Sequence, residues 1–107
     1  MKKTPILSAI LLSATFPFAG MIAHAATQTF AGVVSDSMCA KQHMIPGKTA
    51  AQCIEECIKA GSGYVLVVDN KVYKLSAKPD TLAKFAGKHV QVEGELRDNT
   101  IAITAIR

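Results

Sequence analysis

The chain has 107 residues, of which 50% are hydrophobic and 6% aromatic, and its formal net charge is +4 at pH 7. A chain of this length forms one small domain. The few aromatic residues and the small positive charge argue against a nucleic-acid-binding protein, which needs a basic groove with stacking aromatic side chains.

The N-terminus has the three parts of a secretory signal peptide. Residues 1–3 are a basic start, residues 6–22 are mostly apolar, and Ala23-His24-Ala25 is a small-residue cleavage site. We expect residues 1–25 to be removed on export to the periplasm or the medium, which lowers the formal charge by two and leaves residues 26–107 as a single domain. The interrupted apolar run is short for a membrane span of about 20 residues, so no span is expected after cleavage.

The first part of the mature chain predicts a strand followed by a short helical turn. The stretch TFAGVVS, residues 29–35, has the composition of a β-strand, with a bulge at Gly32. The stretch SDS, residues 35–37, supplies N-caps for a helical turn over residues 38–44. Pro46-Gly47 then ends that turn.

A second helix is predicted directly after this turn. Thr49 and Gln52 have the spacing of a capping box, and the helix ends near Ala60. Its polar face carries two glutamates. Its apolar stripe, which contains both cysteines of the helix, consists of Ala50, Cys53, Ile54, Cys57 and Ile58.

The rest of the chain predicts two hairpins with a short helix between them. Asp69-Asn70 and Asp98-Asn99 are the tight turns of the hairpins, and Pro79 and Gly87 mark the start and the end of the helix. The strand segments are residues 64–68, 71–75, 88–97 and 100–106. Strict alternation in the third of these places four residues on the core face: Val90, Val92, Gly94 and Leu96.

This order of elements predicts a mainly β fold, a five-stranded OB-like barrel. It carries a helical insertion at about residues 36–61, between the first two strands, and a short helix between the third and fourth strands.

The stretch LAKFAGKHVQVEGELRDNTIAITAI, residues 82–106, resembles the last helix and hairpin of bacterial OB-fold proteins. Together with GVVSDSMCAKQHM and CIEEC, most of residues 30–106 resembles a group of small exported bacterial OB-fold-like proteins. Their first loop carries Cys, His, Cys and Cys. The resemblance implies architecture and location, and little about activity.

The chemistry of the sequence is concentrated in the helical insertion. Four candidate metal ligands follow the pattern C-x3-H-x9-C-x3-C: Cys39, His43, Cys53 and Cys57. Residues four apart on a helix share one face, with Cβ atoms about 5–6 Å apart, so each pair can direct two ligands to a common point. Three sulfurs and one imidazole suit tetrahedral Zn²⁺. The sequence therefore predicts a transition-metal site.

Two methionines leave the identity of the metal open. Met38 and Met44 lie on either side of the first ligand pair. Thioether and thiolate ligands together favour Cu⁺ over Zn²⁺. Methionine also fills gaps in small cores without any metal role, so the sequence leaves zinc and copper as alternatives.

A disulfide is the alternative use of the cysteines. Cys53 and Cys57 are one helical turn apart, and their Cβ atoms are too distant for a bridge, which needs about 3.5–4.5 Å. A bridge would therefore join Cys39 to one of them and stabilise the domain by about 3 kcal/mol. The third thiol would remain free. The protein would then be a disulfide-stapled interaction module that binds a protein or small ligand and acts in envelope stress. Inert core cysteines are a third option.

No catalytic pattern accompanies these residues. Glu55 and Glu56 are adjacent and point apart on a helix, the C-x-x-C-H pattern of c-type haem is absent, and His89 lies on the polar face of its strand. We therefore expect a binding protein and not an enzyme. Its expected partners are a metal ion and a protein of the cell envelope.

Overall fold

The computed structural model describes residues 13–15, 26–42 and 46–107. The predicted cleavage site and His43 lie outside these residues. The described part of the chain forms five strands and two helices, in the order expected from the sequence. The elements are β1 (Gln28–Asp36), α1 (Ala50–Lys59), β2 (Tyr64–Val68), β3 (Lys71–Ser76), α2 (Pro79–Ala83), β4 (His89–Arg97) and β5 (Thr100–Ile106).

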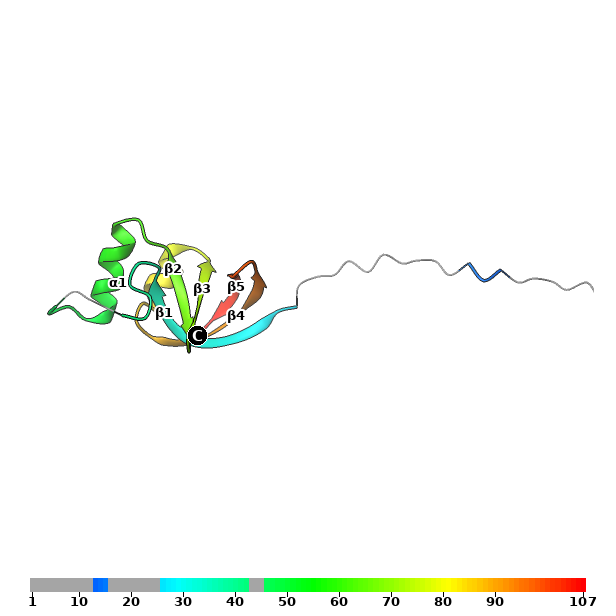
Figure 1. Cartoon of the computed structure of the whole chain (residues 1–107), viewed down its shortest axis with the longest axis horizontal. Coiled ribbons are helices and arrows are strands. Elements are labelled where there is room, and N and C mark those ends of the chain that lie inside the picture. Colours follow the sequence, from blue (N-terminus) through cyan, green and yellow to red (C-terminus); the bar gives the residue numbers. More distant parts are fainter. Residues whose placement is uncertain (1–12, 16–25, 43–45) are drawn as a thin grey trace, which may run out of the picture.

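The five strands form one sheet that closes in a ring (Figure 1). β1 pairs with β2 along one edge and with β4 along the other, antiparallel to both. β3 and β5 make the parallel pair that completes the ring. Neither helix of the described residues has the length and hydrophobicity needed to cross a lipid bilayer.

The core fills the inside of this ring. Its buried side chains come from four of the five strands: Val34, Leu66, Val90, Val92 and Ile101. Each such side chain stabilises the fold by about 1.5–3 kcal/mol relative to an exposed one. The alternation predicted for β4 is confirmed, because Val90 and Val92 are buried whereas His89 and Gln91 are exposed.

Two glycines allow the strands of the ring to approach closely. A Cβ atom on Gly32 would collide with the carbonyl oxygen of Val67 in β2, and one on Gly94 would collide with that of Ala102 in β5. The bulge predicted at Gly32 is not found, because β1 keeps a continuous register with β4 there. The irregularity lies instead between Glu93 and Gly94, where the register of β4 with β5 shifts.

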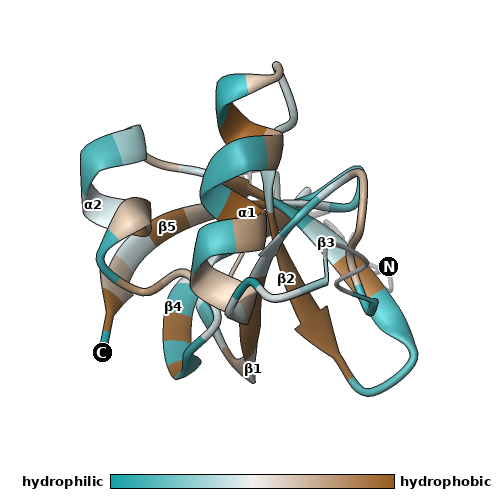
Figure 2. Ribbon diagram, turned by 90° about the vertical axis from the view of Figure 1, so that its left-hand side faces the viewer, coloured by the Kyte–Doolittle hydropathy of each residue, from teal (hydrophilic) through white to brown (hydrophobic). Residues whose placement is uncertain are grey.

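The predicted helix after the first strand is present as α1. Thr49 Oγ1 accepts a hydrogen bond from Gln52 N (3.2 Å), and Gln52 Oε1 accepts one from Thr49 N (2.9 Å), which completes the capping box. Cys53 and Ile54 are fully buried. α1 lies beside the ring next to β1 (Figure 1), and its ribbon is banded with hydrophilic and apolar stretches, in contrast to the largely apolar β2 (Figure 2).

Candidate metal centre

Three cysteine sulfurs meet where the chain leaving β1 faces α1. The Sγ atoms of Cys39, Cys53 and Cys57 all lie within 4.8 Å of one another, and those of Cys39 and Cys57 are 3.5 Å apart. All three are free thiols, since a disulfide requires about 2.05 Å. Zn–S bonds of about 2.3 Å place the sulfurs of a tetrahedral site about 3.8 Å apart. The cluster could therefore hold one metal ion with little rearrangement.

α1 carries two of the three cysteines, and both ends of this helix are capped. The capping box sets the start of the helix, and a Schellman motif sets its end: Gly61, with φ +101, donates its N–H to Ile58 O, and Ser62 N donates to Cys57 O, both at 3.0 Å. Cys53 and Cys57 therefore stand one turn apart on the helix face that looks toward β1. Cys53 is completely buried and Cys57 is half-buried.

Cys39 is held by a turn and not by a helix. Asp36 Oδ2 accepts hydrogen bonds from Met38 N and Cys39 N, both at 2.9 Å, which are the N-cap contacts predicted for this segment. Ala40 then adopts φ +43, and Ser35 Oγ donates to its carbonyl oxygen (2.6 Å). Ala40 N donates to Asp36 O (2.8 Å), which closes a single turn over residues 36–40. Because the left-handed Ala40 interrupts the helical backbone, the helical turn predicted over residues 38–44 does not continue through residues 41 and 42.

Two serines join this turn to the chain that follows α1. Ser37 Oγ and Ser62 Oγ are 2.8 Å apart. Ser37 N donates to Gly63 O (2.9 Å), and Gly63 N donates to Ser37 Oγ (3.2 Å). The turn that presents Cys39 is thereby fastened to the segment that follows Cys57, and this brings two distant sulfurs together.

The thiol of Cys57 is stabilised in its protonated form. Its hydrogen bond with Cys39, burial and the neighbouring Asp36 carboxylate together raise the pKa of Cys57 from 9.0 to about 12. Cys57 therefore carries its proton at neutral pH in the metal-free protein. A metal ion that binds here has to displace that proton.

The structure brings together three of the four predicted ligands and adds a residue that the sequence did not single out. Cys39, Cys53 and Cys57 form one cluster, while His43 lies outside the described residues. Asp36, predicted as a helix cap, is fully buried and accepts the backbone N–H of Cys39. The sequence signal that could have indicated it is an acidic residue at the end of a strand, three positions before a cysteine.

Met38 is exposed to solvent and is not part of the core. Its side chain is 65% exposed, the largest exposure of a bulky hydrophobic side chain among the described residues. It therefore does not fill a gap in the core. Met44, its counterpart in the copper interpretation, lies outside the described residues.

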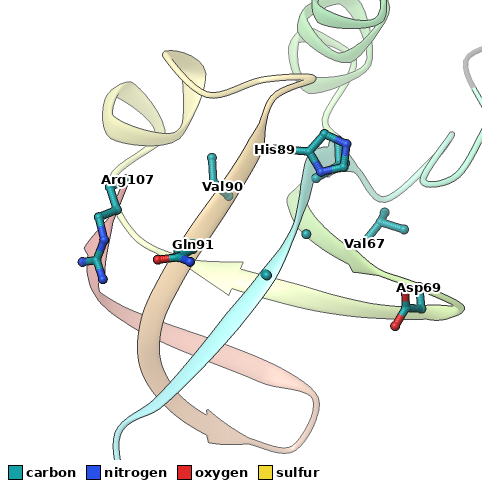
Figure 3. A pocket seen from close by; sticks show the side chains of 9 residues that line it. Val67, Asp69, His89, Val90, Gln91 and Arg107 are labelled. Atoms are coloured by element: carbon teal, nitrogen blue, oxygen red, sulfur yellow. The ribbon is translucent and has the colours of Figure 1, made fainter.

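A separate open pocket lies across β1, β2 and β4. Ala31 and Gly32 of β1 form part of its lining. His89, Asp69 and Arg107 lie around it from different segments, with Arg107 and Asp69 at opposite ends (Figure 3). The Arg107 guanidinium contacts Glu93 Oε1 at 3.2 Å. Because its polar groups do not converge on one point, the pocket lacks the concentration of ligand atoms that the cysteine cluster has.

Comparisons of the chain with protein families, with curated proteins and with solved structures found no match. The cysteine cluster and its surroundings are therefore the basis for a functional conclusion.

Proposed function

We propose that this protein binds a transition-metal ion, zinc or copper, through the thiolates of Cys39, Cys53 and Cys57. The observation that carries the proposal is the approach of all three sulfurs to within 4.8 Å, across a loop and a helix that are far apart in the sequence. Three thiolates are the soft ligand set that both metals accept. For the fourth position, the spacing in the sequence nominates His43.

The setting that we propose is an exported OB-like domain that acts by binding. The basic, apolar and small-residue segments of residues 1–25 support export with cleavage after Ala25. The ring order β1-β2-β3-β5-β4 and the place of α2 between β3 and β4 support the OB-like assignment. In this setting the metal has a structural, storage or sensing role, and the partner beyond the metal is a protein of the envelope.

Native mass spectrometry of the mature chain, purified from its exported compartment without added metal or reductant, tests the proposal. A mass above that of the metal-free chain by one zinc or copper ion, lost when Cys53 is replaced by alanine, is the expected result. A metal-free mass after incubation with one equivalent of either ion would refute the proposal. His89→Ala, a change on the exposed face of β4, is the control that should leave the metal content unchanged.

A disulfide-stapled interaction module is the second candidate, and one observation favours it. Cys39 Sγ and Cys57 Sγ are 3.5 Å apart, so a movement of about 1.5 Å would close a bridge. The bridge would leave Cys53 as the free thiol. In the same mass spectrum, this candidate predicts a metal-free mass lower by two hydrogen atoms.

A further inference from the structure

Asp36 places a buried carboxylate next to Cys39, whose backbone N–H donates to Oδ2 at 2.9 Å. It is the last residue of β1, and its side chain has no exposed surface. A carboxylate that leaves water loses several kcal/mol of hydration energy unless other groups compensate. Which groups contact each of its two oxygens is therefore informative.

The two oxygens of this carboxylate have different surroundings. Oδ2 accepts hydrogen bonds from Met38 N and Cys39 N at 2.9 Å and from Ser62 Oγ at 3.4 Å. Oδ1 is equally buried and has no hydrogen-bond partner among the described residues. Buried polar oxygens in native proteins nearly always have a partner, and a bound ion can supply the contact that the protein itself does not make.

The charge of Asp36 is also uncompensated by protein cations. None of the ion pairs in the described part of the chain includes it. The same carboxylate accepts the backbone N–H of Cys39, one of the three cysteines of the cluster, at 2.9 Å. A divalent cation held by the sulfurs would satisfy the orphan oxygen and the buried negative charge at once.

We propose that Asp36 Oδ1 is the fourth ligand of the metal ion, and that this oxygen makes the site select zinc over Cu⁺. The inference rests on the proposed metal-binding function. Zinc binds carboxylate oxygen at about 2.0–2.2 Å alongside thiolates, whereas Cu⁺ prefers sulfur ligands alone.

Asp36 then takes the position that the spacing assigns to His43. A structural zinc ion is almost always four-coordinate, so three sulfurs and one carboxylate oxygen complete its shell. The prediction for His43 assumed that it lies on the same helix face as Cys39. Ala40, which lies between them, has a left-handed backbone, so a regular helix does not run from Cys39 through Ala40.

The substitution Asp36→Asn tests this assignment on the mature chain. The amide oxygen of asparagine can still accept from Met38 N and Cys39 N, while its NH2 group, in the place of Oδ1, cannot bind a metal. We expect the zinc affinity, measured by competition with a chromophoric chelator, to fall by at least about 10–100-fold, the loss that even a group outside the coordination shell causes. We expect the Cu⁺ affinity, measured without oxygen in the same way, to stay unchanged.

Matched variants separate ligation from a structural role. Ser62→Ala removes a long hydrogen bond to Oδ2 (3.4 Å) and leaves Oδ1 in place, so it should lose clearly less zinc affinity than Asp36→Asn. His43→Ala should also retain zinc. Equal losses of zinc and Cu⁺ affinity in Asp36→Asn would mean that Asp36 only shapes the turn, and an unchanged zinc affinity would mean that it does not bind the metal. Either result overturns the assignment, as would loss of zinc with His43→Ala alone. A wild-type chain that binds neither ion would instead refute the proposed function.

Discussion

The substitution Cys53→Ala distinguishes the metal site from the disulfide, because Cys53 belongs to the first arrangement and is left over in the second. Its side chain is fully buried on α1, so removing the sulfur leaves a small cavity and should cost the metal-free protein about 1 kcal/mol. Zinc at about a hundred times its dissociation constant should stabilise the wild type by about 2.7 kcal/mol. For a domain of this size, that corresponds to a rise in Tm of about 10–20 °C.

The assay is thermal unfolding of reduced protein, followed by circular dichroism with and without zinc. Cys53→Ala should unfold a few degrees below the wild type and should lose most of the zinc-dependent rise in Tm. Cys57→Ala, the control, removes a half-buried sulfur and should abolish both the zinc effect and any stabilisation by mild oxidation. If Cys53→Ala retained the full zinc-dependent rise, or if the wild type showed none, the reasoning from the three sulfurs would be refuted.

Two further predictions concern the thiol of Cys57 and the packing of β1. Only the thiolate form of cysteine reacts with an alkylating agent. Alkylation of Cys57 in the metal-free protein, followed by peptide mass mapping, should therefore be slow at about pH 8 and accelerate about tenfold per pH unit toward its pKa of about 12. A reaction rate that levels off near pH 9 would contradict this. Its folded pKa is raised, so its stabilising contribution is full below pH 9.0 and is lost as the pH rises toward 12. Gly32→Ala should destabilise the ring by about 1–3 kcal/mol in urea unfolding, because the added methyl group meets the Val67 carbonyl. Gly63→Ala, which has open space around it, should be near neutral, and equal effects of the two changes would count against the close approach.

Local rules of the sequence accounted for most of the elements. The capping box of Thr49 and Gln52 depends on residues within one turn, and both of its hydrogen bonds are present. The hairpin turn at Asp98-Asn99 has φ values of +46 and +65, as a two-residue turn of the primed type requires. The alternation in β4 marks its buried face because side chains in a strand point to opposite sides.

Features that depend on contacts between residues far apart in the sequence could not be predicted from local sequence patterns. The strand pattern around Gly32 predicts a bulge, but what requires a glycine there is the closeness of Val67 on the neighbouring strand. For the same reason the sequence placed Asp36 close to Cys39 without indicating that its carboxylate is buried. A serine and aspartate stretch before a cysteine is typical of a helix cap, and only the packing of β1 against α1 shows that this carboxylate is buried with one oxygen free of hydrogen bonds.

The position of the cluster shows where a metal ion or a disulfide would stabilise the insertion more than it would stabilise the ring. The strands of the ring pair with one another on both sides, whereas α1 has ten residues and is too short to be stable in isolation. Its attachment to the ring includes the buried Cys53 and Ile54 and the hydrogen bonds of Ser62 and Gly63 with residues 36–38. A metal ion shared by Cys39 from the loop and two cysteines of α1 would add its binding energy at this junction, so that metal affinity and the docking of α1 would become one equilibrium. The same coupling would let a partner that binds α1 alter the metal affinity, and the metal alter the binding of that partner, by equal factors.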